Sequence, residues 1–345
     1  MPKVLENITQ INNSYEKYAL NAHCCQDQNT HSVRTFPLLL DKLAQPPTDP
    51  RKTFEKRARS KYLSRALVLE LTKLDSPLKK SYWNTWHCTN VLHQEGKKIT
   101  AKYCNNRWCL VCNRIRTAKL IKGYLPEIKK MSDPQFVTLT IPNMPASELK
   151  DAIDGMIREF ILIKNVFVRR RGLKIVGIRK LECTFNNKAG EYHPHIHLIV
   201  DGIEIGKALI EEWLHRYPDA DKRGQNIRPA DENSMIELFK YSTKLTTKSL
   251  ITKENGKTII QVNAIALDVI FQAMYNRRIF QSMGLVKQVS EDIEEIDAQI
   301  FEDLKEVKED FWRWEQEVSD WINSDGEMLT GCEAYKKYEV RFDTG

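Results

Sequence analysis

The sequence predicts an α+β fold in which helices flank a largely antiparallel central sheet. Three segments in the middle of the chain have strand character: residues 136–141 (FVTLTI), 172–185 and 192–200. Residues 186–190 (NNKAG) separate the last two and have the composition of a hairpin turn, so those two strands should pair antiparallel. Helical periodicity surrounds them, and strands mixed with helices in this way are typical of an α+β core.

Several segments are predicted to be helical. They are the strongly basic stretch 51–80 and the segments 113–131, 146–170, 205–217 and 233–248. In the acidic stretch 290–322, apolar side chains recur at steps of three and four from Ile293 to Val318. That spacing predicts one long amphipathic helix whose apolar stripe favours packing or dimerisation.

Length and composition indicate a globular protein with more than one core. The chain has 345 residues, 41% hydrophobic and 29% charged, enough for two or three domains. It has no apolar run of about 18 residues, the length that a membrane-spanning helix needs, and its start lacks the pattern of a secretory signal. We therefore expect a cytoplasmic protein without a membrane partner.

The charge of the chain is unevenly distributed. The net charge is +7, yet residues 291–320 hold thirteen acidic and three basic side chains. All other residues together therefore carry a net charge of +17. Such a charge favours a polyanionic partner, because basic side chains that neutralise phosphates release condensed counterions. Nucleic acid is the partner that this charge indicates.

One strand-like segment, YHPHIHLIV, has histidines at alternating positions: His193, His195 and His197. Side chains at i and i+2 lie on the same face of a strand, so His195 and His197 point the same way while Ile196 points into the core. Two imidazoles on one face can bind one divalent metal ion, provided that a third ligand completes the site and positions remain for water or substrate.

The third metal ligand depends on the register of the predicted hairpin. A turn centred on residues 188–189 sets Glu182 opposite His195, where cross-strand side chains are neighbours, and a slip of one residue would replace Glu182. His193 is a competing ligand because it shares the strand face. A mixed histidine and carboxylate site suits Mn²⁺ or Mg²⁺ for work on phosphates, although histidine pairs also bind zinc.

One predicted helix carries a tyrosine among charged side chains. Glu237, Tyr241, Lys244 and Lys248 are spaced at i, i+4, i+7 and i+11, which sets them near one helix face. The lysines can hold a phosphate and favour the phenolate, whose ordinary pKa is about 10, and the carboxylate can accept a proton. Glu237 also fits a capping box with Ser234, which would make its role structural.

A compact group of cysteines follows the basic segment: Cys88, Cys104, Cys109 and Cys112. Four such thiolates fit a closed tetrahedral zinc site, which stabilises a fold without catalysing a reaction. His87 or His93 could replace Cys88 as the fourth ligand. The remaining cysteines are predicted to be free thiols: Cys24, Cys25, Cys183 and Cys332. Basic side chains near the cluster, with Trp108 and the basic helix 51–66, make this region a candidate for binding duplex DNA.

Three motifs, in this order, resemble those of a known superfamily. FVTLTIPN (136–143), HPHIHLIV (193–200) and the E-x-x-x-Y-x-x-K helix (237–244) are similar to the motifs of plasmid rolling-circle replication initiators, the Rep proteins of the HUH endonuclease superfamily. "HUH" denotes histidine, a bulky apolar residue and histidine, which the sequence HIH matches. The resemblance covers roughly residues 80–285. The tyrosine helix has no second tyrosine, which indicates the single-tyrosine type.

The resemblance implies an HUH-type central antiparallel sheet flanked by helices. The cysteine spacing adds an N-terminal zinc-binding segment to this prediction, and the spacing of apolar residues in 290–322 adds a helical C-terminal part. The resemblance also implies a site-specific DNA endonuclease and strand transferase. A metal held by His195 and His197 would polarise the scissile phosphate, and Tyr241 would attack it. The products would be a 5′-phosphotyrosine and a 3′-hydroxyl primer, later rejoined or terminated. Lys244 would assist the attack, and Glu237 would help to end the reaction.

With this resemblance, the chain is predicted to have four regions. They are an N-terminal extension (1–50), a basic helical and zinc-binding region (51–130), an HUH nicking domain (131–285) and an acidic helical C-terminal region (286–345). Predicted DNA contacts are Lys240, Lys248, Arg114 and Arg116.

The predicted partners are a plasmid origin, single-stranded at the nick, and the host helicase and polymerase, with self-association through the acidic helix. Two alternatives assign a different role to the histidine strand. The first is an HUH transposase or a relaxase, although relaxases usually carry the tyrosine before the histidines. The second is a zinc-dependent DNA-binding regulator in which the histidine strand is purely structural.

Overall fold

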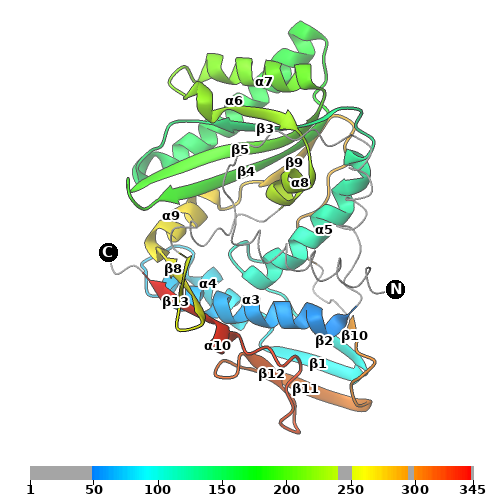
Figure 1. The fold of residues 1–345 in the computed structure, drawn as a ribbon. Helices are drawn as coiled ribbons and strands as arrows, with labels where there is room; N and C mark the ends of the chain where they lie inside the picture. The colour runs from blue at the N-terminus through cyan, green and yellow to red at the C-terminus, as the bar shows by residue number, and fades with distance from the viewer. Residues whose placement is uncertain (1–48, 240–250, 294–298, 343–345) are drawn as a thin grey trace.

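The computed structural model describes residues 49–239, 251–293 and 299–342. Figure 1 shows an upper part built on a large sheet and a lower part in which helices pack on a small sheet. Helices α5 (Leu110–Ile128) and α9 (Ala264–Met274) lie between the two parts. Among the described residues, no helix combines the length and the apolar character that crossing a bilayer requires.

The central sheet has five antiparallel strands in the order β6-β3-β5-β4-β9. Their bounds are β3 Pro134–Thr140, β4 Gly177–Asn186, β5 Glu191–Asp201, β6 Asn226–Pro229 and β9 Phe280–Met283. Strands β4 and β5 form a long hairpin that closes between Asn186 and Glu191. The prediction of an α+β fold with an antiparallel central sheet and a hairpin turn at residues 186–190 is therefore confirmed.

Helices α6 (Ala146–Arg171) and α7 (Ile203–Arg216) cover one face of the central sheet. The guanidinium of Arg179 on β4 lies 5.8 Å from the ring centre of Phe160 on α6. Helix α7 approaches the sheet closely at Gly206, where a Cβ atom would lie 2.3 Å from Cδ1 of Ile227. Both helices match the segments predicted from their periodicity.

Helices α5 and α8 (Glu232–Phe239) lie on the opposite face of the sheet. The ring of Phe239 stacks between Tyr124 of α5 and Phe280 of β9, at centroid distances of 5.7 and 6.0 Å. Only the first part of the helix predicted at 233–248 can be compared, because residues 240–250 lie outside the described part of the chain.

The basic segment 51–80 forms helix α3 (Pro50–Leu71) and the start of helix α4 (Lys79–His87). Pro50 occupies the first turn of α3, where a missing N–H costs nothing. Asp49 caps that turn, since its Oδ1 accepts a hydrogen bond of 2.9 Å from the backbone N–H of Arg51. Residues 72–78 break the helical stretch and turn the chain into α4.

The acidic C-terminal segment is not a helix, so the prediction of a long amphipathic helix and of a helical C-terminal part is wrong. Its described residues form strands β10 (Gln299–Ile300), β11 (Val307–Glu315) and β12 (Asp320–Ile322). These join β1 (Val91–Gly96) and β2 (Lys98–Ala101) in a sheet of order β10-β2-β1-β11-β12. An apolar helix face therefore no longer supports a prediction of dimerisation.

The alternation of buried and exposed side chains along β11 explains why this segment is a strand and not a helix. Trp312 and Trp314 are buried, whereas the neighbouring strand residue Phe311 is 43% exposed. This is the period of two that a half-buried strand requires. The two tryptophans belong to a core cluster with Phe54 and Ala58 of α3. Packing against a helix more than two hundred residues earlier in the chain thus overrides the local spacing of three and four.

A third, smaller sheet completes the described fold. Strand β7 (Ile251–Glu254) pairs antiparallel with β8 (Lys257–Val262), and β13 (Tyr338–Phe342) pairs parallel with β8 after the short helix α10 (Ala334–Lys337).

A buried carboxylate fastens α4 to α9. Oδ1 of Asp268 on α9 accepts hydrogen bonds from the hydroxyl of Tyr82 on α4 and, at 2.6 Å, from that of Ser76, while Oδ2 accepts one of 2.7 Å from Gln272. Burial, with the Asp268 hydrogen bond, raises the pKa of Tyr82, so the phenol remains a donor. This arrangement sets the position of α4 on the molecule.

We expect Asp268→Ala to lower the free energy of unfolding by about 2–4 kcal/mol, because two buried hydroxyl donors lose their acceptor. Urea denaturation followed by tryptophan fluorescence measures the change. Asp219→Ala, at an exposed position, is the matched control and should change stability by less than about 0.5 kcal/mol. Equal stability of the two variants would contradict a structural role for the Asp268 cluster.

Candidate active site

The register of the β4–β5 hairpin gathers polar side chains on one face of the central sheet. Glu182 pairs with His195, and Lys180 pairs with His197. Paired residues point to the same side of a sheet, so all four side chains share the face opposite α6. The predicted register, with Glu182 across from His195, is therefore confirmed.

Glu182, His195 and His197 form a compact cluster. One ligand atom from each of the three residues lies within 4.8 Å of the other two. Nε2 of His195 is 4.0 Å and Nε2 of His197 is 3.8 Å from Oε2 of Glu182. All three side chains are buried. Two imidazole nitrogens and a carboxylate in this arrangement could hold a divalent metal ion.

The other ring nitrogen of each histidine has a partner that orients the ring. Nδ1 of His195 lies 3.0 Å from the backbone carbonyl oxygen of His193, and because a carbonyl only accepts, Nδ1 carries the proton. Nδ1 of His197 lies 3.1 Å from Oγ1 of Thr138 on β3. In this orientation Nε2 of both rings faces Glu182, which is the pattern that metal-binding histidines adopt.

His193, the competing third ligand, lies outside this cluster. Its Nδ1 is 2.8 Å from Oδ1 of Asn143, in the loop that follows β3. Burial lowers the pKa of its imidazole. Of the two predicted candidates, the structure therefore brings Glu182, and not His193, to His195 and His197.

Lys180 is a site residue that the sequence analysis missed. Its Nζ lies 2.7 Å from Oε2 of Glu182, and both side chains are 1% exposed. Nζ also donates a hydrogen bond of 3.1 Å to the backbone carbonyl of Glu237 on α8. The lysine thus balances the buried carboxylate and fastens α8 to β4. The sequence signal for Lys180 is its position two residues before Glu182, which sets both side chains on the same strand face.

Glu237 lies at the edge of the histidine cluster. Its Oε1 is 4.0 Å from Nε2 of His197, and its side chain is 26% exposed. It does not form the predicted capping box, because the helix starts earlier. Asp231 Oδ1 accepts from the N–H of Ser234, and Ser234 Oγ accepts from the N–H of Asp231, at 2.7 and 3.1 Å. The structural alternative for Glu237 as a cap partner is therefore wrong.

The predicted residues that follow on this helix cannot be compared. Lys240, Tyr241, Lys244 and Lys248 all lie outside the described residues. The described part of α8 ends at Phe239, two residues before the tyrosine in the chain.

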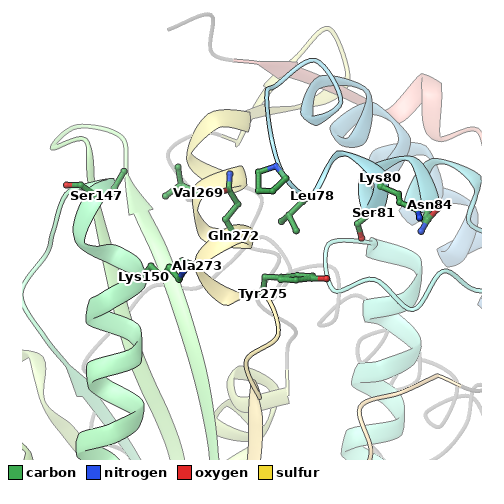
Figure 2. Close-up of a pocket in the computed structure, with 12 residues that line it drawn as sticks. Leu78, Lys80, Ser81, Asn84, Ser147, Lys150, Val269, Gln272, Ala273 and Tyr275 are labelled. Atoms are coloured by element: carbon green, nitrogen blue, oxygen red, sulfur yellow. The ribbon is translucent and has the colours of Figure 1, made fainter.

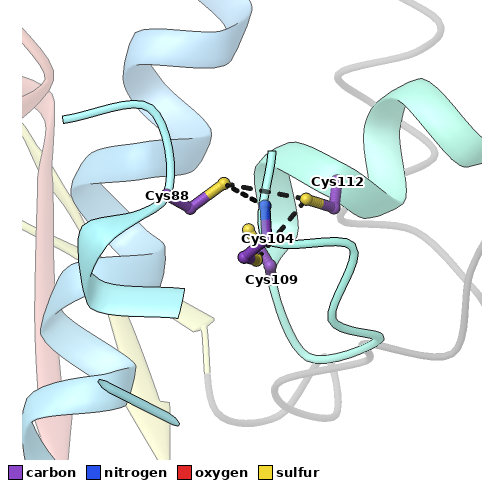
Figure 3. Close-up of side chains that lie close together, drawn as sticks. All are labelled: Cys88, Cys104, Cys109 and Cys112. Atoms are coloured by element: carbon purple, nitrogen blue, oxygen red, sulfur yellow. Dashed lines mark hydrogen bonds between the residues drawn. The ribbon is translucent and has the colours of Figure 1, made fainter. Parts of the chain in front are cut away.

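The four predicted cysteines meet between α4 and α5, as Figure 3 shows. Their sulfur atoms all lie within 4.8 Å of one another, and Sγ of Cys112 is 3.7 Å from that of Cys88 and 3.6 Å from that of Cys104. Cys88 directly follows α4, and Cys109 directly precedes α5. The described histidines nearby bond elsewhere, His87 to Asn90 and His93 to Glu309.

The chemistry of the four thiols fits a cation. Although burial alone raises the pKa of Cys109, hydrogen bonds from Cys104 and Cys112 lower it well below its ordinary value. The pKa values of Cys88 and Cys112 are raised by hydrogen bonds within the cluster and by burial. Four thiolates, three of them buried, are therefore unfavourable together unless a positive ion compensates them.

Some basic residues predicted to bind DNA are structural. Arg116 is 2% exposed, and its guanidinium bonds to Asn113, to the carbonyl of Glu291 and to Asn105. The prediction of a DNA contact for Arg116 is thus wrong, because its donors already hold the loop around the cysteine cluster. Arg114 is half-buried, with Nε 3.4 Å from Oγ of Ser60.

The other features assigned to DNA binding in this region are also largely internal. Trp108 is 4% exposed, and Arg57 and Lys61 on the basic helix α3 are buried. Lys61 donates to the carbonyl of Cys88 and, at 2.8 Å, to Oδ1 of Asn90. Outside the cluster, Cys183 and Cys332 are buried free thiols, as predicted.

Fold and site together define an α+β protein with a histidine and carboxylate cluster on an antiparallel sheet and a four-cysteine cluster between α4 and α5. A family described as replication protein matches residues 95–201. That range contains Glu182, both histidines of the cluster and three of the four cysteines.

Curated relatives are named as replication proteins. "Protein rep" from Staphylococcus aureus is 30% identical over 176 residues, which cover 44% of this chain and 73% of that protein. "Protein rep" from Streptococcus pneumoniae serotype 2 is 31% identical over 214 residues, covering 55% and 62%. "Protein rep" from Bacillus amyloliquefaciens is 24% identical over 252 residues, covering 62% and 71%. No solved structure gives a significant match.

The chain therefore belongs to the Rep family of plasmid replication initiators. Membership confirms the predicted relationship to plasmid Rep proteins and a role in DNA replication, and it favours replication over the transposase and relaxase alternatives.

Proposed function

We propose that this initiator nicks one strand of a plasmid double-strand origin by attack of Tyr241 on a phosphodiester, assisted by a divalent metal. The observation that carries the proposal is the buried Glu182, His195 and His197 cluster, with both histidine Nε2 atoms turned toward the carboxylate. Packing alone does not account for two imidazoles and a carboxylate converging on one point.

Glu182, His195 and His197 would hold Mn²⁺ or Mg²⁺. When bound, such an ion supplies Lewis-acid polarisation of the scissile phosphate and stabilises charge on its non-bridging oxygens. The carbonyl of His193 keeps His195 in the metal-binding tautomer, and Thr138 holds the orientation of the His197 ring. Lys180 holds the carboxylate in place through its 2.7 Å contact.

In the proposed reaction, the phenol oxygen of Tyr241 forms a bond to phosphorus and the bond from phosphorus to the 3′ oxygen breaks. The phenol gives up its proton, and the leaving 3′ oxygen takes one, so the products are a 5′-phosphotyrosine and a 3′-hydroxyl. The phosphotyrosine conserves the energy of the broken bond, so a later attack by a 3′-hydroxyl rejoins a strand without ATP. Lys244 assists by balancing phosphate charge.

Glu237 is suited to end the reaction. Its carboxylate lies 4.0 Å from His197 and is partly exposed, so it stands between the buried cluster and solvent. There it can accept a proton from water or from an incoming 3′-hydroxyl that attacks the phosphotyrosine. The backbone contact from Lys180 fixes the turn of α8 that carries it.

We propose that the four cysteines bind a structural zinc ion. The ion would join the end of α4 to the start of α5, and so connect the lower helices to the helix that packs against α8. A closed set of four thiolates stabilises a fold and leaves no position for substrate.

Tyr241→Phe should abolish the covalent protein–DNA adduct and reduce nicking of supercoiled origin plasmid by more than about 10³-fold, because the nucleophile is lost. Adduct formation is measured by denaturing electrophoresis with Mn²⁺ present, and mass spectrometry maps the modified tyrosine. Tyr335→Phe on α10 is the matched control. If Tyr241→Phe still nicks the plasmid, or if the wild type forms no adduct with any divalent metal, a DNA-binding regulator becomes the better description.

Glu182→Ala should weaken Mn²⁺ binding, measured by isothermal titration calorimetry, by at least about 100-fold, since loss of a direct ligand exceeds the effect of losing an outer-shell partner. His193→Ala removes the competing candidate and should leave the affinity unchanged within error. Circular dichroism verifies that both variants fold. The reverse pattern would assign the third ligand to His193.

Cys109→Ser should reduce the zinc content of the purified protein from about one ion per chain and lower its melting temperature, because a structural zinc site contributes folding energy directly. Zinc is measured by elemental mass spectrometry. Cys183→Ser, a buried thiol outside the cluster, is the matched control and should retain the metal. Full zinc retention by Cys109→Ser would rule out the four-cysteine site.

A further inference from the structure

Helix α4 has one buried face and one exposed face. Tyr82 and Thr85 are its buried side chains. The opposite face carries Lys80, Trp83, Asn84 and His87, which are spaced at i, i+3, i+4 and i+7 and are all exposed. Trp83 is 43% exposed, an unusual position for a side chain with so much apolar surface.

A groove of about 750 Å³ runs beside this face. In Figure 2, the first turns of α6 and helix α4 lie on opposite sides of the groove, with α9 between them. The polar and aromatic residues that line it are Lys80, Ser81, Asn84, Ser147, Lys150, Gln272 and Tyr275. The lining includes two lysines and no acidic side chain.

The charge of this groove is available to a ligand. Both Lys80 and Lys150 are exposed, and neither forms an ion pair with the part of the chain that the structure describes. Lys61 and Arg116 differ from these two lysines, because their hydrogen-bond donors bond to the protein itself. Tyr275 adds a ring that is 48% exposed.

We propose that α4 is the element with which this initiator binds duplex DNA, with its exposed face in the major groove and the backbone of one strand in the neighbouring protein groove. The inference rests on the proposed function, because it assigns the duplex-binding surface of the same enzyme. A major groove admits one α-helix. Lys80 and Lys150 pair with phosphates of the strand that passes between them.

The exposed face of α4 also has the side chains that read bases. An asparagine amide can bond to the N6 and N7 edge of adenine, and apolar contact recognises the thymine methyl group. Asn84 and Trp83 are neighbours on this face and offer these two contacts. His87 lies on the same face, about one helical turn beyond Asn84. A hydrogen bond from Tyr82 to Asp268 holds the helix on α9, so the reading face is rigid.

This surface is separate from the proposed nicking site. The histidine cluster lies on the face of the central sheet opposite α6, whereas the first turns of α6 form a wall of the groove. The histidine cluster and the lining of the groove have no residue in common. Under the two proposals, the DNA strand that Tyr241 attacks and the DNA duplex at α4 are bound by different parts of the protein.

The test compares two double variants of the full-length protein in the Tyr241→Phe background, which removes strand cleavage from the measurement. Lys80→Glu with Lys150→Glu changes the groove, and Lys98→Glu with Lys253→Glu changes charge equally at exposed strand positions elsewhere. Fluorescence anisotropy measures the affinity for a labelled random-sequence duplex over a range of salt. The slope of log affinity against log salt should become less steep by about two units in the groove variant alone.

Base reading is tested by selection from a duplex library with a randomised centre. The wild type should enrich a common sequence, and Asn84→Ala should lower its preference for that sequence over random duplex by roughly 5- to 150-fold, the loss expected for one base contact. Unchanged preference would overturn the assignment of α4 as the reading helix.

Two other results would also overturn the proposal. One is an equal loss of salt dependence in both double variants, which would mean that overall charge matters and the groove does not. The other is a groove variant that loses affinity for a single-stranded oligonucleotide while keeping duplex affinity. Neither result depends on whether Tyr241 is the nucleophile, so failure of this inference is distinguishable from failure of the nicking proposal.

Discussion

The pairing of β4 with β5 is the constraint on which the candidate site depends. Because the side-chain period of a strand is two, a slip of one residue would exchange Glu182 for an apolar neighbour and turn the carboxylate to the face covered by α6. The register also sets Lys180 beside Glu182, at 2.7 Å in a site that water hardly reaches. A buried carboxylate needs such a partner, and a lone one would be strongly unfavourable. Hence one hairpin supplies the ligands, the compensating charge and the anchor for α8.

This part of the molecule could be predicted because its determinants are local. The turn residues 186–190 fix where the hairpin closes, and the alternation of histidine with apolar residues fixes which face is polar. Glu182 opposite His195 follows from those two facts alone. The cysteine cluster was equally predictable, since Cys109 and Cys112 are separated by less than one helical turn and Cys104 is nearby.

Most of the errors involve partners far away in the chain. Trp312 and Trp314 form a strand because they pack on α3, which the acidic segment itself does not encode. Arg116 looks like a nucleic-acid ligand until Glu291 and Asn105 are seen to occupy its donors. Lys180 was missed for a related reason. A lysine on a strand is normally solvated, and only burial beneath α8 converts it into a part of the site.

Helix α6 connects the central sheet with the groove beside α4, and this connection bears on where a DNA strand is cut. Helix α6 has 26 residues and is about 39 Å long, at 1.5 Å per residue. It packs on the sheet along one side and contributes its first turns to the groove beside α4. A helix of this length, packed against a five-stranded sheet, is a stiff connection. Under the two proposals, the duplex held at α4 and the phosphate at the histidine cluster are therefore separated by a distance that the fold determines. The enzyme would cut at a constant offset from the sequence it reads, and it would need no moving arm to choose the position of the nick.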